Sequence, residues 1–345
     1  MHMADALISP PVAGTMWAAT AGLVAYCSRK IREELDERKA PLMGVLGAFI
    51  FSAQMINFSI PVTGSSGHLG GGMILSILLG PHAAFITMAS ILTVQALFFA
   101  DGGLLALGCN VFNMAFFPCF VAYPLIFRKI VGERPTQGRL LTGAMLASVV
   151  ALQLGAFCVV LETRFSGITE LPFKQFALLM QPIHLAIGIV EGLVTAAVVG
   201  MVWKARPETR FLGAGVGPAG GGSYRKLLGG LALLTCVTAG LLSWFASAQP
   251  DGLEWSMAKT SGKEELAVPD RGVFAAAGAV QQKTAFLPDY DFKKSEVSGG
   301  TEEAGTGGGA VVPVGTSVAG LVGAGLTLAL VAALGWGLRS RRRIA

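Results

Sequence analysis

Residues 139–162 read RLLTGAMLASVVALQLGAFCVVLE, an apolar run that carries charge only at its two ends. A helix needs about 20 such residues to cross the hydrocarbon core of a bilayer. The whole chain shares this character, because 53% of its 345 residues are hydrophobic and only 14% are charged, whereas an ordinary soluble domain carries about 25% charged residues. The composition therefore predicts an all-α integral membrane protein.

Apolar runs of comparable character recur along the chain. They predict membrane spans at 10–28, 42–60, 69–80, 82–100, 104–127, 139–162, 180–203, 227–248 and 316–338. The third run is short, and Gly80-Pro81 separates it from the fourth. Because irregular backbone at membrane depth survives only inside protein, we expect this run to form a half-length helix that is buried among its neighbours.

A glycine-rich segment at 211–225 interrupts the apolar runs and is typical of a linker between domains. We expect a first domain at 1–210 with about seven transmembrane helices. A second domain at 226–345 is predicted to be a two-helix hairpin whose extracytoplasmic loop covers about 249–315.

The Lys and Arg residues predict the orientation in the membrane, since cytoplasmic loops are enriched in both. Four segments hold 18 of the 26 basic residues, namely 29–39, 128–139, 204–226 and 339–343. All four lie on one side of the predicted spans. We therefore expect a multi-pass protein of the inner (cytoplasmic) membrane, with its N-terminus outside and its C-terminus in the cytoplasm. The positive net charge follows from this bias and does not indicate a nucleic-acid partner.

The chain begins with Met1-His2, and a free amino terminus followed by histidine can chelate a divalent transition metal. The terminal amine, the deprotonated backbone nitrogen of His2 and one imidazole nitrogen close two fused chelate rings. A fourth nitrogen would complete a planar arrangement, which suits Ni(II), Cu(II) or Co(II) better than tetrahedral Zn(II). A histidine at position 2 can also belong to a frayed terminus without function. Because residues 1–9 lack the basic start of a signal peptide, we expect Met1 to be the true terminus.

His68, within TGSSGHLGGG at 63–72, is the leading candidate for the fourth nitrogen, because its loop is expected on the same outer side. His184 opens the span 180–203 from that side as well, whereas His82 is expected on the cytoplasmic side. Glu191 follows His184 by seven residues and therefore lies on the same helical face. It could orient a ligand, line an ion path or serve helix packing.

Polar residues within the predicted spans need an explanation, because such groups are expensive in lipid. They are Gln54, Asn57, Gln95, Asn110, Asn113, Gln153 and Glu191. The residues that could orient the metal ligands or line an ion path are Asp5, Asn57, Ser66, Asp101, His184 and Glu191. The single cysteines form no CxxC pair and are expected to be packing residues.

Five separated motifs resemble, in order, the CbiM/NikM family, the substrate-binding membrane components of energy-coupling factor (ECF) transporters for cobalt and nickel. They are MHMADALISPP at 1–11, GSSGHL at 64–69, QALFFADGG at 95–103, NVFNM at 110–114 and HLAIGIVEG at 184–192. The resemblance implies that Met1 through its amine, His2 through backbone and side chain, and His68 hold the metal in near-planar four-nitrogen coordination. Ala4 and Ala6 depart from the commoner family pattern, in which Pro and Gly flank the acidic residue.

The second domain also resembles a known component. PDGLEW at 250–255 and FLPDY at 286–290 are similar to the PDGLE, or NikN-like, small component, which has two spans and aids metal loading. The resemblance implies that both components are fused in this chain.

No GxxxxGK[ST] phosphate loop is present in the sequence, so we expect no bound nucleotide here and ATP hydrolysis in partner chains. The resemblance implies a transmembrane coupling (T) subunit and cytoplasmic ABC-type ATPases as partners in the lipid bilayer, with Ni(II) or Co(II) as the transported substrate. The expected function is therefore transport and not enzymatic catalysis. The alternative is a proton-coupled secondary transporter that uses Glu191. The choice between nickel and cobalt stays open, because both accept the same nitrogens.

Overall fold

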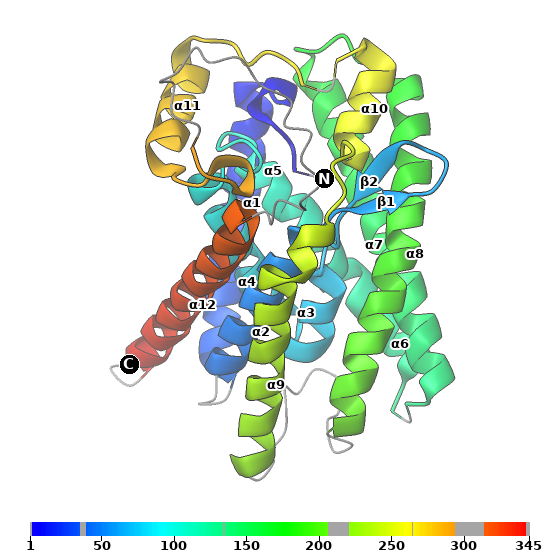
Figure 1. The fold of residues 1–345 in the computed structure, drawn as a ribbon, viewed down its shortest axis with the longest axis vertical. Helices are drawn as coiled ribbons and strands as arrows, with labels where there is room; N and C mark the ends of the chain where they lie inside the picture. Colours follow the sequence, from blue (N-terminus) through cyan, green and yellow to red (C-terminus); the bar gives the residue numbers. More distant parts are fainter. Residues whose placement is uncertain are drawn as a thin grey trace, which may run out of the picture.

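The computed structural model describes residues 2–34, 39–133, 135–205, 221–263, 265–293 and 314–342. These residues form an all-α membrane protein with one small β-hairpin (Figure 1). The main helices are α1 (Pro10–Glu34), α2 (Lys39–Gln54), α3 (Gly72–Leu79), α4 (Pro81–Phe98), α5 (Leu107–Val111), α6 (Arg128–Val131), α7 (Gln137–Ser166), α8 (Phe173–Ala205), α9 (Gly221–Gly240), α10 (Gly252–Ser261), α11 (Gly272–Thr284) and α12 (Val314–Arg342). Short 3₁₀ turns occur at Asp5–Leu7, Leu242–Phe245 and Pro288–Tyr290.

Five helical segments of the described chain are long and apolar enough to cross a membrane. They are Pro81–Phe98, Leu107–Val131, Gln137–Ser166, Phe173–Lys204 and Val314–Leu338. The multi-pass membrane character predicted from composition is therefore confirmed. The number of transmembrane helices stays a prediction.

Two predicted spans are wrong at their outer ends. The span 42–60 was expected to be one helix, but α2 ends at Gln54 and Phe58–Ile60 forms strand β1. This strand pairs antiparallel with β2 (Ser65–Gly67). The turn between them contains a proline and Gly64 at a φ of 73°, the turn chemistry that hydropathy alone does not register. In the span 227–248, α9 ends at Gly240.

The helix α3 is the half-length helix expected from the short third run. All eight of its residues are buried. Gly80, which has a φ of 81°, separates it from α4, and Pro81 begins α4. Proline suits this first helical position because its missing N–H would have no partner there.

The segment that contains α5 and α6 is one continuous helix with an unusual middle. Residues Phe112–Phe127 between them adopt a π-helix, and this stretch contains Pro118 and Pro124. A proline lacks the N–H and collides with the carbonyl one turn earlier in a regular helix. The wider turn accommodates both prolines without a sharp break in the segment.

Small residues allow close helix contacts. A Cβ on Gly192 of α8 would lie 2.7 Å from the Cα of Met145 on α7, and one on Gly188 would lie 3.0 Å from the Cα of Val149. In the second domain, Gly323 of α12 packs directly on the ring of Phe51 in α2. The long helices of the second domain, α9 and α12, both pack against α2 of the first domain.

Parts of both domains gather at one end of the molecule. The N-terminal segment, the β-hairpin, α10 and α11 lie together there (Figure 1). The expected loop at 249–315 thus contains two helices that cover the first domain. The helix α9 begins at Gly221, within the expected linker 211–225, and residues 211–220 lie outside the described chain.

Candidate metal-binding site

The N-terminal segment is held against the first domain just after His2. Met1 lies outside the described residues. The Met3 N–H donates to Asn110 Oδ1 at 2.7 Å, and Asn110 Nδ2 donates to the Met3 carbonyl at 3.1 Å. Gly103 N–H donates to the same carbonyl at 2.9 Å. With Met3 fully buried, these three bonds fix the main chain that carries His2.

Asp5 anchors the next turn of this segment. Its Oδ1 accepts a hydrogen bond from the Ala106 N–H at 2.9 Å, just before α5 begins. Burial raises the pKa of this carboxyl above its ordinary value. Asp5 was predicted as a residue that could orient the metal ligands. The contact found in the structure is with the main chain of the first domain.

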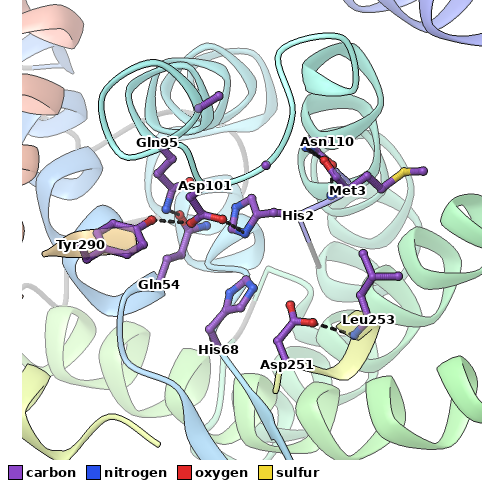
Figure 2. A network of polar contacts seen from close by, with 12 residues as sticks. His2, Met3, Gln54, His68, Gln95, Asp101, Asn110, Asp251, Leu253 and Tyr290 are labelled. Carbon is purple, nitrogen blue, oxygen red and sulfur yellow. Dashed lines mark hydrogen bonds and ion pairs between the residues drawn. The ribbon is translucent and has the colours of Figure 1, made fainter. Parts of the chain in front are cut away.

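The structure brings His2 and His68 together at the end of the molecule that holds the hairpin and α10. Their rings are stacked, with centroids 5.0 Å apart and planes inclined by 15° (Figure 2). Two imidazoles bound side by side to one ion, each with a nitrogen–metal distance of about 2.0 Å, would have centroids roughly 4–5 Å apart. The two rings therefore stand close to the spacing that one shared metal ion requires.

The His2 ring is oriented by Asp101. Its Nδ1 lies 3.2 Å from Asp101 Oδ1, and Asp101 Oδ2 accepts a short hydrogen bond from the hydroxyl of Tyr290. The other ring nitrogen, Nε2, is buried and has no hydrogen-bond partner among the described residues. Only Nδ1 can close a six-membered ring with the main-chain nitrogen of the same residue. A metal chelated in this way would have to take the place that Asp101 holds at Nδ1.

The His68 ring is oriented by its own loop. Its Nδ1 lies 3.1 Å from the Leu69 carbonyl, so Nδ1 is assigned the proton and Nε2 becomes the nitrogen for a metal. Burial lowers the pKa of both His2 and His68 to about 3. Both imidazoles are therefore neutral at pH 7, which is the form that binds metals.

Two polar side chains from the helices hold Gly70 and Gly71, and a third side chain holds one of these two in place. Glu191 accepts hydrogen bonds from the N–H groups of Gly70 at 2.5 Å and Gly71 at 3.0 Å. Gln54 Nε2 donates to the Gly70 carbonyl at 2.8 Å, and Gln95 Nε2 donates to Gln54 Oε1 at 3.0 Å. Of the roles considered for Glu191, its contacts favour a structural one, as an anchor for the loop of His68.

His184 lies near His68 but does not stack on it. Its Nδ1 lies 2.8 Å from the Met180 carbonyl, one turn earlier in α8. His184, His68 and Asp251 line a common cavity of about 10 Å³. A cavity of this volume is at the lower limit for one water molecule, so His184 borders the site without sharing a large space with it.

Ser66 and Asn57, predicted to orient ligands or line an ion path, contact the second domain. The Ser66 N–H donates to the Pro250 carbonyl at 2.8 Å, and its hydroxyl donates to the Gln249 carbonyl at 2.7 Å. The Asn57 carbonyl accepts from the Ser247 N–H at 2.7 Å. Both residues therefore join the hairpin that precedes His68 to the second domain.

A cavity of about 530 Å³ lies between the two domains, and His2 and His68 are part of its lining. Six carboxyl residues line it as well, namely Asp5, Asp101, Asp251, Glu254, Glu265 and Asp289. No Lys or Arg is among the described residues of this lining. In a chain with a net charge of +5, this cavity is a local concentration of acidic groups that would attract cations.

Sequence reasoning missed several residues of this region. Asp251 and Tyr290 stood within quoted motifs but received no role. Gln54, Gln95 and Asn110 were noted only as polar residues in need of explanation. Glu162, at the end of a predicted span, was passed over, although it accepts a hydrogen bond from Asn113 Nδ2 at 2.7 Å. No local pattern gives these pairings, because their partners are far apart in the sequence.

Within the described residues, no group of three His, Cys, Asp or Glu side chains is placed to hold a metal ion. The donor set predicted from the sequence has a different composition. Two of its four nitrogens belong to the main chain and the amino terminus, so only two side chains are needed.

Two known protein families match most of the chain. Residues 2–209 match CbiM, described as a cobalt uptake substrate-specific transmembrane region. Residues 225–340 match the PDGLE domain.

Individual proteins are similar to the chain over both parts or over the first. The fused nickel transport protein NikMN of Rhodobacter capsulatus is 29% identical over 310 residues, which covers 84% of this chain and 88% of that protein. The cobalt transport protein CbiM of Geobacter sulfurreducens is 30% identical over 255 residues, covering 70% of this chain and 71% of that protein.

Two crystal structures share the fold of the first domain. They are those of a transition metal transporter and of a truncated transition metal transporter, each with a TM-score of 0.53 and 30% sequence identity. Each match covers 59% of this chain, and the two matches cover 93% and 99% of the solved chains.

Proposed function

The chain belongs to the CbiM family of cobalt uptake substrate-specific transmembrane proteins and carries a PDGLE domain, and on this premise we propose that it is the substrate-specific component of an ATP-driven ECF transporter that imports Ni(II) or Co(II). It is a membrane component of nickel or cobalt transport of the CbiM/NikM type. The observation that carries the finer proposal is the stacked pair of His2 and His68 at the outer end.

The metal is held by four nitrogens. The amine of Met1, the deprotonated main-chain nitrogen of His2 and His2 Nδ1 occupy three neighbouring corners of a plane. His68 Nε2 takes the fourth corner, opposite the main-chain nitrogen and next to the His2 imidazole. The 5.0 Å separation of the two ring centroids supports this arrangement, because imidazoles at neighbouring corners lie close together. Planar nitrogen coordination favours Ni(II), Cu(II) or Co(II) over Zn(II).

The metal enters from the outside, and energy comes from the other side of the membrane. The histidine pair, the hairpin and the acidic cavity share one end of the molecule, opposite the ends of the helices that carry most Lys and Arg. A transmembrane coupling subunit and two cytoplasmic ATPases of the ABC type supply the cycle of ATP hydrolysis, because this sequence contains no phosphate loop of its own.

The contacts of Glu191 do not favour the alternative of a proton-coupled secondary transporter. Its Oε2 and Oε1 accept hydrogen bonds from Gly70 and Gly71 respectively. A carboxylate fixed to the main chain in this way suits a structural role better than a proton carrier, which has to alternate between partners.

Metal content of the purified full-length protein tests the ligand set. After equilibration with Ni(II) or Co(II) and removal of excess metal, we expect about one ion per chain. His2→Ala and His68→Ala should lose it, whereas His82→Ala, which changes a histidine at the start of α4, should keep it. A variant extended by two residues before Met1 should also lose the metal, because its amine no longer closes the first chelate ring. Full binding by the extended variant would remove the amine from the ligand set.

Uptake in cells tests the source of energy. Cells that express this chain with its partner subunits should accumulate Ni(II) or Co(II), and deletion of the partner ATPases should abolish accumulation. Uptake that persists without the ATPases but stops when the proton gradient is collapsed would favour the secondary transporter.

A further inference from the structure

The PDGLE motif of the second domain is docked directly on the hairpin that leads to His68. The Pro250 carbonyl accepts the Ser66 N–H, two residues before His68. On the other side of the turn, Trp255 Nε1 donates to the Thr63 carbonyl at 3.0 Å. The motif therefore contacts both the turn and the strand that position His68.

Gly252 allows the motif to approach the first domain closely. A Cβ at this position would lie 2.6 Å from Cγ2 of Ile183 and 3.2 Å from Cε1 of His184. Leu253, the next residue, is 1% exposed. The glycine and the buried leucine hold the start of α10 against α8, directly beside the site.

The side chain of Asp251 is fixed by the helix that it begins. Its Oδ1 accepts the N–H groups of Leu253 at 2.8 Å and Glu254 at 2.9 Å. In return, Glu254 Oε2 accepts the Asp251 N–H at 3.0 Å, which completes a capping box. Oδ1 thus accepts both hydrogen bonds from the start of α10. Because these bonds fix the carboxylate group, they also fix the position of its other oxygen, Oδ2.

This fixed carboxylate faces the proposed metal site. Asp251 lines the small cavity together with His68 and the large cavity together with both His2 and His68. Figure 2 shows it beside His68, where α10 begins. Its charge acts on both imidazoles, since it raises the pKa of each against the larger lowering effect of burial.

The proposed metal complex requires such a negative charge. A divalent ion bound to a neutral amine, two neutral imidazoles and one deprotonated amide keeps one net positive charge. A charge in a buried site is costly unless an opposite charge accompanies it. Asp101 contacts His2 through Nδ1, the nitrogen that the metal is proposed to take, so its position must change on loading. Asp251 is instead held by the N–H groups of Leu253 and Glu254, which the metal does not displace.

We propose that Asp251 supplies the counter-charge for the bound Ni(II) or Co(II), so that the second domain completes the metal site of the first. The carboxylate acts on the ion as a fixed charge and is not a ligand. The inference rests on the function proposed above, but it concerns a residue outside the four-nitrogen set. It assigns a role to the Asp of the PDGLE motif: the same side chain begins α10 and stabilises the metal.

Asp251→Asn in the full-length protein separates the charge from the helix cap, because Asn caps a helix about as well as Asp. We expect Ni(II), measured by isothermal titration calorimetry of the detergent-solubilised protein, to bind about 10–100-fold more weakly, the range typical for loss of a residue that supports metal ligands. Asp251→Glu should recover most of the affinity. The melting temperature of metal-free Asp251→Asn should match that of the wild type.

Glu265→Gln is the matched control. It removes one charge from the same cavity at an exposed position. We expect the affinity for Ni(II) to change by less than about threefold, because solvent screens this charge. Equal losses of Ni(II) affinity in Asp251→Asn and Glu265→Gln would overturn the inference, because the loss would then follow from the total charge of the cavity and not from Asp251.

The outcomes also separate this inference from the proposed function. Wild-type affinity in Asp251→Asn, together with lost binding in His68→Ala, would overturn the role of Asp251 and leave the metal site intact. Failure of the wild type itself to bind Ni(II) or Co(II) would overturn the proposed function. If Asp251→Asn lowered the melting temperature, the affinity of Asp251→Glu would distinguish the two explanations. Restored affinity for Ni(II) in Asp251→Glu would support the role of Asp251 as a counter-charge. Weak binding in both variants would contradict that role.

Discussion

At the scale of single residues, burial keeps the two stacked histidines in the neutral form that the proposed metal site requires. An exposed histidine has a pKa of about 6.5 and is partly protonated in mildly acidic surroundings. Burial lowers the pKa of His2 and His68 to about 3. Both rings therefore keep an unprotonated nitrogen over the whole physiological range, so a metal ion does not have to compete with a proton for the imidazole.

The same burial predicts a pH dependence of stability. Below pH 6.5 the unfolded chain binds protons on these histidines, whereas the folded chain does not until the pH approaches about 3. The stability of the metal-free protein should therefore fall as the pH decreases from 6.5 towards 3, by at most about 1.4 kcal/mol per pH unit for each histidine. It should be insensitive to these two groups above pH 6.5.

Thermal unfolding in detergent with a chelator present measures this effect. His68→Gln removes one of the two titrating groups, so its melting temperature should fall less steeply between pH 6.5 and pH 4 than that of the wild type. Parallel curves for the two proteins would show that His68 titrates alike in the folded and unfolded chain, contrary to its burial.

At the scale of the structural elements, the site depends on short connections held by longer helices. The hairpin β1–β2 delivers His68, and the loop between α4 and α5 delivers Asp101. The N-terminal segment lies beside this loop through the bond between Gly103 and Met3. Buried apolar side chains such as Met3, Ile8 and Phe99 anchor these pieces, and polar contacts from the helices add to their hold.

Gly103 in this loop packs tightly against the N-terminal segment. A Cβ there would collide with the carboxylate of Asp5 and lie 2.5 Å from its main-chain nitrogen. Over-packing of this kind typically costs about 1–3 kcal/mol. We expect Gly103→Ala to displace the segment that carries His2 and to weaken Ni(II) or Co(II) binding by about one order of magnitude.

Gly138→Ala provides the control, because a Cβ on this glycine of α7 meets nothing within 4 Å. Metal titration of both variants and of the wild type, at equal detergent concentration, checks the effect. Unchanged affinity in Gly103→Ala would mean that the segment adjusts without moving His2.

At the scale of the whole molecule, the second domain is packed on the first along its full height. In the membrane region α9 and α12 lie against α2. At the end that holds the histidine pair, the main chain of the second domain accepts or donates hydrogen bonds at Asn57, Ser66 and Phe99. The acidic cavity exists only between the two domains, since four of its six carboxyl residues come from the second.

This packing predicts that the covalent connection between the domains is dispensable once the protein is folded. A protease site inserted between residues 211 and 220 should allow the chain to be cut, and the two parts should still elute together in size-exclusion chromatography. The cut protein should also keep its affinity for Ni(II) or Co(II), because the contacts near His68 are unchanged.

Gly323→Leu tests the interface in the same experiment. Gly323 packs on the ring of Phe51, and a larger side chain there cannot fit without moving α12 away from α2. The cut variant should therefore separate into two parts. Separation of the cut wild-type protein would show that the interface alone does not hold the domains together.

The sequence by itself determined the properties that depend on local composition. Hydropathy predicted the membrane character and the short buried helix α3, because the length and apolarity of a run are local properties of the sequence. The sequence did not predict the contacts of Gln54, Gln95 and Asp251. Each of these side chains meets groups that are far away in the sequence, and no local pattern encodes such a pairing.

Only the tertiary structure decided that Asp101 faces His2 Nδ1, that Glu191 anchors the loop after His68, and that the PDGLE motif borders the histidine pair. It also placed Ser66 against the second domain, where sequence reasoning had expected a role near the metal. The physical reason is that a buried polar group must find a hydrogen-bond partner, and which groups are available is fixed by how the helices pack. Composition determines that the chain enters the membrane, and packing determines which side chains meet around the histidine pair.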